Sequence, residues 1–151
     1  MIELDPNFSE FIELLHVHEA RFLIVGGYAV GFHGRPRYTA DIDIWLLVDP
    51  ANARAVVAAL ADFGFGDVGL TEADFSVEGQ VVQLGYPPLR IDLLTSIDGV
   101  DFADAYARRV EVELGGLTVP FISLPDLRRN KQASGRAQDL ADVEALADPG
   151  D

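Results

Sequence analysis

The chain has 151 residues, 49% of them hydrophobic, which is enough for one folded domain with a core and excludes a disordered protein. It contains no cysteine, so disulfide bonds, thiolate metal sites and cysteine nucleophiles are excluded. The formal net charge of −14 argues against broad nucleic-acid binding through a basic surface.

The first residues are acidic and lead into an amphipathic helix. Glu3 and Asp5 stand where a signal peptide would carry basic residues, and no apolar run is long enough to span a bilayer, so we expect a cytoplasmic protein without membrane contacts. Hydrophobic residues recur at helical spacing over residues 6–19 and predict an N-terminal helix. The apolar run at 21–25 is typical of a buried central strand.

A glycine pair follows this strand. Gly26 and Gly27 precede a short helix predicted at 28–32, and glycines there let the backbone approach a ligand closely. Free N–H groups at the start of that helix can receive phosphate oxygens. The alternative is a tight turn that packs the helix on the strand and has no chemical role.

Two aspartates, one residue apart, open the next predicted strand at 41–48. The side chains of Asp41 and Asp43 point to the same face of a strand, and two carboxylates held that close repel each other unless a cation lies between them. The pair therefore indicates a metal site. The structural alternative is that both carboxylates cap neighbouring backbone groups or pair with Arg35 and Arg37 in the preceding loop.

The rest of the chain alternates between helices and strands. Periodicity, caps and turn residues predict helices at 50–63, 101–108, 124–134 and from 136, a helical turn at 71–75, strands at 80–86 and 90–94, and a hairpin of strands at 110–114 and 117–122. We expect one α/β (α+β) domain over residues 1–151, with a mixed sheet flanked by helices and a helical C-terminus. Its expected parts are the N-terminal helix (6–19), the catalytic sheet and helices (22–122) and the C-terminal helices (124–147).

The glycine pair and the aspartates can contribute to one site if their strands are antiparallel neighbours. Gly26, Gly27 and Gly31 do not follow the G-x-G-x-x-G spacing of dinucleotide-binding folds, and the P-loop pattern is absent, which disfavours a nicotinamide enzyme. Metal-assisted phosphoryl or nucleotidyl transfer fits better, because magnesium takes oxygen ligands and two such ions can activate the attacking oxygen and neutralise the leaving group.

The glycine and aspartate motifs resemble those of a known family. Gly26-Gly27, the Asp41-Ile42-Asp43 motif and Asp92 between apolar residues resemble the nucleotidyltransferase superfamily that includes DNA polymerase β. The form Gly-Gly-Tyr-Ala-Val, His-Gly-Arg and Thr-Ala-Asp-Ile-Asp is similar to a small bacterial branch with lincosamide nucleotidyltransferases and abortive-infection (type IV toxin) nucleotidyltransferases. The late lysine and the Arg-x-x-Asp element of that branch match Lys131 and residues 136–139, and the resemblance covers residues 22–146.

The resemblance implies a metal-dependent enzyme that moves a nucleoside monophosphate from an NTP to a hydroxyl group and releases pyrophosphate. It implies that Asp41, Asp43 and Asp92 hold magnesium, as two ions, with manganese as an alternative, and that Asp92 is also the candidate base. The residues expected to bind the nucleotide are Gly26, Gly27, Arg35, Arg37, Thr39, Lys131, Arg136 and Asp139.

The acceptor and the partners are left open by the sequence. The acceptor is either a small hydroxylated molecule, as in antibiotic resistance, or a protein or RNA end, as in toxin–antitoxin systems. Relatives take acceptor specificity from extra C-terminal helices or a partner subunit, so we expect a homodimer or a small helical protein partner. The alternative function is a nucleotide-binding regulatory or toxin–antitoxin partner module without turnover.

Overall fold

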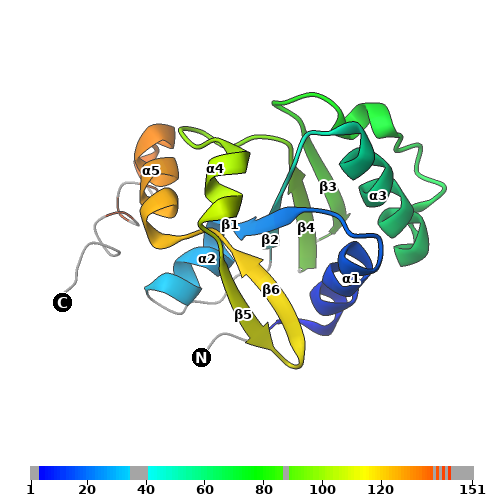
Figure 1. Cartoon of the computed structure of the whole chain (residues 1–151), viewed down its shortest axis with the longest axis horizontal. Helices are drawn as coiled ribbons and strands as arrows, with labels where there is room; N and C mark the ends of the chain where they lie inside the picture. The colour runs from blue at the N-terminus through cyan, green and yellow to red at the C-terminus, as the bar shows by residue number, and fades with distance from the viewer. Residues whose placement is uncertain are drawn as a thin grey trace.

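The computed structural model describes residues 4–34, 41–86 and 89–137, together with residues 139, 141 and 143. The helices are α1 (Pro6–Val17), α2 (Gly26–His33), α3 (Pro50–Leu60), α4 (Phe102–Ala107) and α5 (Leu124–Ser134), with shorter turns η1 (Ala61–Phe65) and η2 (Glu72–Phe75). The strands are β1 (Phe22–Val25), β2 (Asp41–Leu46), β3 (Val81–Tyr86), β4 (Leu89–Leu94), β5 (Val110–Leu114) and β6 (Leu117–Phe121) (Figure 1).

The six strands form one mixed sheet in the order β3-β4-β2-β1-β6-β5. The expected antiparallel pairing of β1 with β2 is confirmed, and β5 and β6 form the expected hairpin. In addition, β2 pairs with β4, and β1 with β6, in parallel. The sheet and its helices confirm the predicted fold class, a single α/β domain with a mixed sheet.

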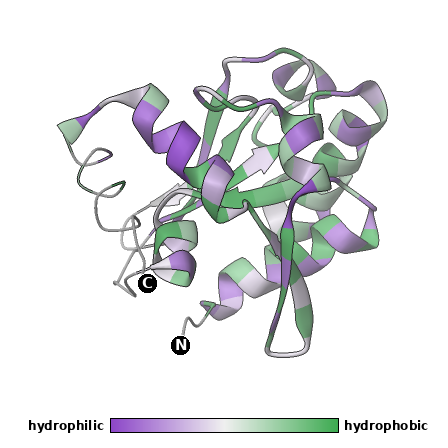
Figure 2. Ribbon diagram, turned by 60° about the vertical axis from the view of Figure 1, so that its left-hand side comes forward, coloured by the Kyte–Doolittle hydropathy of each residue, from purple (hydrophilic) through white to green (hydrophobic). Residues whose placement is uncertain are grey.

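The helices cover the sheet on two sides. Figure 1 shows α1 and α3 on one side and α4 and α5 on the other, with α2 at the end of β1. Trp45 of β2 meets Phe102 of α4 edge to face at 5.0 Å between ring centroids, and Phe32 of α2 lies 4.8 Å from Phe121 of β6. The strands between these layers are mostly hydrophobic in Figure 2, and the central strand β1 is buried at every residue.

Several predicted boundaries are wrong by two residues. The first helix ends at Val17 rather than residue 19, where Glu19 has a positive φ of 61°. Helix α2 begins at Gly26 rather than Tyr28, so the glycine pair forms its first turn. Strand β2 ends at residue 46 rather than 48, since the side chain of Asp49 accepts hydrogen bonds from backbone N–H groups at the start of α3.

Some predictions fall wholly or partly outside the described residues. These are the loop with its basic residues, the Pro87-Pro88 turn and most of the last helix. Of that helix, predicted from Arg136, the structure describes Arg136 as non-helical and Ala137, Asp139, Ala141 and Val143 as helical. Within the described part of the chain, no helix has the length and apolar character needed to cross a membrane.

Candidate active site

A cavity of about 610 Å³ lies where β1 ends and where β2 and β4 begin. It brings together residues that are far apart in the chain. The predicted site residues that line it are Gly26, Gly27, Asp41, Asp43, Asp92, Lys131, Arg136 and Asp139. The remaining three, Arg35, Arg37 and Thr39, lie outside the described residues.

Strand pairing places the three carboxylates on one face of the sheet. In the parallel pair of β2 and β4, Asp43 lies opposite Asp92 and Asp41 lies opposite Arg90. Since side chains alternate along a strand, Asp41 and Asp43 share a face, and Arg90 and Asp92 share the same one. The sheet therefore fixes the spacing of the acidic residues.

Arg90 forms ion pairs with two of these carboxylates. Its Nη2 donates to Asp41 Oδ2 at 2.9 Å and to Asp92 Oδ2 at 3.4 Å, and its Nε donates to Asp92 Oδ1 at 3.1 Å. Sequence reasoning did not assign Arg90 to the site. The Arg-x-Asp spacing on a predicted strand was the available signal, because residues two apart lie on one face.

Asp43 carries the strongest electrostatic penalty in the cavity. Burial, together with the nearby carboxylates of Asp92 and Asp41, raises its pKa to about 7. A cation beside these groups would relieve the penalty, and carboxylate oxygens are the ligands that Mg²⁺ prefers, so the donor set fits this ion. Within the described ranges, however, no group of three His, Asp or Glu side chains is already placed to hold a metal.

The close approach of the backbone to Asp43 explains why a glycine occupies position 26. Its φ is +67°, and a Cβ atom added there would lie 2.0 Å from Asp43 Oδ2. The backbone therefore comes against the carboxylate itself, which a side chain would prevent. No side chain forms a capping hydrogen bond at the start of α2 in the described structure, and Gly26 and Gly27 of its first turn line the cavity.

Lys131 is held by a buried carboxylate on the far wall of the cavity. Asp139, only 2% exposed, accepts from Lys131 Nζ at 3.0 Å, from Arg136 Nε at 2.6 Å and from the hydroxyl of Ser134. Burial alone would raise the pKa of Asp139, but these hydrogen bonds outweigh it and lower the pKa to about 2. Asp139 thus fixes the ammonium group of Lys131 in position.

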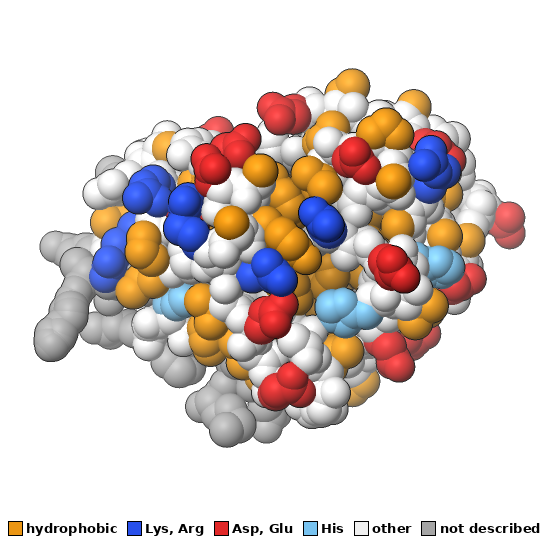
Figure 3. Space-filling model, viewed as in Figure 1, with side chains coloured by type: hydrophobic (Ala, Val, Ile, Leu, Met, Phe, Trp, Pro, Cys, Tyr) orange, Lys and Arg blue, Asp and Glu red, His pale blue; other side chains and the backbone are white. Residues whose placement is uncertain are grey.

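A second ionic cluster anchors α5, which carries Lys131. The fully buried carboxylate of Asp126 accepts two hydrogen bonds from Arg108, at 3.0 and 2.9 Å, and one from the hydroxyl of Ser123 at 3.1 Å. In Figure 3, basic side chains gather over the side of the molecule where α5 lies, and acidic side chains lie beside them. The net negative charge is therefore unevenly distributed.

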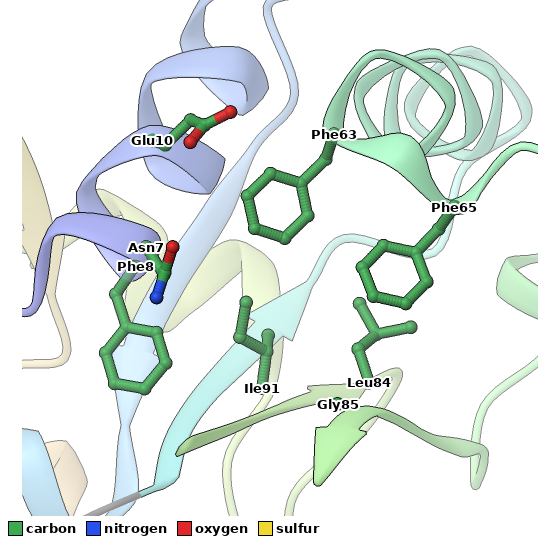
Figure 4. Close-up of a pocket in the computed structure, with 8 residues that line it drawn as sticks. All are labelled: Asn7, Phe8, Glu10, Phe63, Phe65, Leu84, Gly85 and Ile91. Carbon is green, nitrogen blue, oxygen red and sulfur yellow. The ribbon is translucent and has the colours of Figure 1, made fainter.

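A separate hollow of about 330 Å³ lies between α1, η1 and the β3–β4 pair (Figure 4). Its lining is mainly apolar, with Phe63, Phe65 and Ile91 pointing inward and Asn7 and Glu10 on α1. Ile91 is next to Asp92 in β4 and therefore points to the opposite face of the sheet. None of the predicted site residues lines this hollow.

Comparison with known protein families gives one match over most of the chain. A family model described as "Nucleotidyltransferase of unknown function (DUF6036)" matches residues 4–147. No curated protein matches the chain.

Two solved structures are similar over most of the chain. One is an antigenic nucleotidyltransferase-like protein from Paracoccidioides brasiliensis, with 20% identity, 94% of this chain and 75% of that chain covered, and a TM-score of 0.54. The other is the lincosamide antibiotic adenylyltransferase LnuA in its lincomycin-bound form. It is 14% identical, with 95% of this chain and 96% of that chain covered and a TM-score of 0.56. At these identities the likeness shows a shared fold.

Proposed function

The chain belongs to the family of nucleotidyltransferases of unknown function (DUF6036), and on that premise we propose that it transfers a nucleoside monophosphate from an NTP to a hydroxyl group. The observation that carries this proposal is the convergence of Asp41, Asp43, Asp92 and Lys131 on one cavity. Carboxylates suited to a divalent cation, next to a fixed ammonium group, form a site for a polyphosphate.

Each wall of the cavity has its own part in the proposed reaction. Asp41, Asp43 and Asp92 would hold Mg²⁺, with Mn²⁺ as an alternative and two ions as the full complement. When bound, the metal supplies charge neutralisation on the triphosphate and activation of the hydroxyl. The N–H groups at the start of α2 and the ammonium of Lys131 would bind phosphate oxygens, and Asp139 would keep Lys131 oriented.

The proposed reaction is a single displacement at the α-phosphorus. The acceptor oxygen forms a bond to this phosphorus, the bond to the oxygen that bridges to the β-phosphorus breaks, and pyrophosphate leaves with the bonding electrons. The proton of the acceptor hydroxyl would pass to Asp92, the candidate base. The protein mainly contributes positioning and electrostatic stabilisation.

The acceptor would be bound with the help of a second chain. We propose that residues 1–151 act as a single nucleotidyltransferase domain, since one sheet and one core run from Phe8 to Leu127. The acceptor would be held between two copies of the chain or against a helical protein partner. A small hydroxylated acceptor is supported by the likeness in fold to a lincomycin-bound adenylyltransferase, while a protein or RNA end is the other class.

The test is incubation with each α-labelled NTP, Mg²⁺ and a panel of acceptors that includes lincosamides, aminoglycosides, tRNA and proteins. We expect label transfer and equimolar pyrophosphate release, and an Asp41→Ala variant should lose at least about 100-fold in rate. Asp67→Ala, which alters an exposed aspartate outside the cavity, is the matched control. Nucleotide binding without any pyrophosphate release would instead support a regulatory module without turnover.

A further inference from the structure

The guanidinium of Arg90 occupies the space between two of the proposed metal ligands. It donates to Asp41 Oδ2 and to both carboxylate oxygens of Asp92, at distances between 2.9 and 3.4 Å. We propose that Arg90 is a positioning residue that takes the place of the cation in the metal-free protein and turns aside when a divalent cation binds. This inference rests on the proposed function, because it requires the carboxylates to be metal ligands.

The contacts of Arg90 and of a metal ion exclude each other. Mg²⁺ binds carboxylate oxygens at about 2.0–2.1 Å and in near-octahedral geometry. Arg90 already uses one oxygen of Asp41 and both of Asp92, and its charge would repel an ion placed beside them. This agrees with the lack, among the described side chains, of any three acidic or His groups already placed to hold a metal.

Arg90 also has room to move. Its side chain remains 29% exposed, and the residue paired with it on β3 is Gly85, which has no side chain to hold the guanidinium in place. Arg90 itself lines the cavity, so a guanidinium that leaves Asp41 and Asp92 is still close to the space where a triphosphate would lie. Arginine binds phosphate oxygens with two parallel hydrogen bonds.

The consequence is coupling between metal and nucleotide. A metal ion that displaces Arg90 breaks its hydrogen bonds with Asp41 and Asp92. A triphosphate that then binds the guanidinium forms new hydrogen bonds with it and offsets part of this loss. Each ligand should therefore increase the affinity for the other, as linkage requires. Metal alone should bind weakly, and metal with nucleotide should bind more tightly.

The test compares Mn²⁺ binding, without nucleotide, in the wild type and in Arg90→Gln by electron paramagnetic resonance titration. Removing the competing charge should tighten Mn²⁺ binding by at least about tenfold. Arg109→Gln is the matched control, because Arg109 is 30% exposed and pairs with Glu111 at 3.0 Å outside the cavity. In saturating Mn²⁺, Arg90→Gln should bind a non-hydrolysable ATP analogue more weakly than the wild type.

The outcomes separate this inference from the proposed function. If Asp43→Asn binds Mn²⁺ as well as the wild type, the carboxylates are not the metal site, and the metal assignment in the proposed function fails. If Mn²⁺ binding needs Asp43 but Arg90→Gln leaves it unchanged or weakens it, the role of Arg90 is refuted and the metal assignment stands. Should Arg90→Gln fail to fold by circular dichroism, Arg90→Met, which also removes the charge, replaces it, and any failure to tighten Mn²⁺ binding overturns the inference.

Discussion

Replacing Asp43 by asparagine should stabilise the metal-free protein at alkaline pH while abolishing its proposed activity. Asp43 is a partly buried carboxyl close to Asp92 and Asp41, and these surroundings raise its pKa to about 7. Asparagine has nearly the same shape and carries no charge, and its amide can donate a hydrogen bond to Asp92. The substitution therefore removes the repulsion without opening a cavity.

The size of the effect follows from the pKa shift. The ordinary pKa of 3.8 rises to about 7 in the folded state, so between these values the folded protein holds a proton that the unfolded chain has released. Stability therefore falls as pH rises through this window, and the loss is complete above it, at up to roughly 4 kcal/mol. The Asp43→Asn variant has no carboxyl at this position and does not show this loss. The difference in free energy of unfolding between the variant and the wild type should therefore be near zero at pH 4 and largest at pH 8.

The assay is urea unfolding of the wild type and Asp43→Asn in EDTA at pH 5 and pH 8. Asp67→Asn, which changes an exposed aspartate outside the cavity, should leave stability within about 0.5 kcal/mol of the wild type at both pH values. Added Mg²⁺ should stabilise only proteins with an intact Asp43. A variant that is no more stable than the wild type at pH 8 would refute the reasoning that charge crowding penalises Asp43.

Other consequences can be measured in the same way. Gly26→Ala places a Cβ against Asp43 and should abolish Mn²⁺ binding, whereas Gly69→Ala, also at positive φ but with open space, should cost only about 1–2 kcal/mol in thermal unfolding. Lys131→Met leaves the buried Asp139 with fewer partners and should destabilise the fold by about 2–3 kcal/mol in urea, with weaker nucleotide affinity by calorimetry. The pKa of Asp139 is lowered to about 2, so its contribution to stability is present above about pH 4 and should be lost as pH falls towards 2. Asp139→Asn should flatten that part of an acid titration followed by circular dichroism.

Most elements could be predicted because their signals are local. Asp49 caps α3 from the position that a capping aspartate normally takes, and Gly115-Gly116 turns the β5–β6 hairpin with both φ values positive. The parallel pairing of β2 with β4 could not be predicted, because paired positions such as Asp43 and Asp92 lie 49 residues apart in the chain. Only tertiary packing decides which strands become neighbours over such a separation.

The candidate site was predictable as a set of residues and not as an arrangement. The acidic motif and the late lysine stand out in the sequence, and the structure brings them to one cavity. Arg90 was not assigned to the site because the arginines closest to the aspartates along the chain, Arg35 and Arg37, were the expected partners. Its actual partners depend on strand register, which local patterns do not specify.

The register of β2 against β4 also limits where the chain can gain or lose residues. A single residue inserted into or deleted from either strand would turn every following side chain to the opposite face, so Asp43 or Asp92 would point into the hydrophobic layer under α1 and α3. Insertions in the segment from η1 to η2, which joins α3 to β3 outside the sheet, leave this register untouched. Functional relatives should therefore differ in length in that segment, and the two acid-bearing strands should keep theirs.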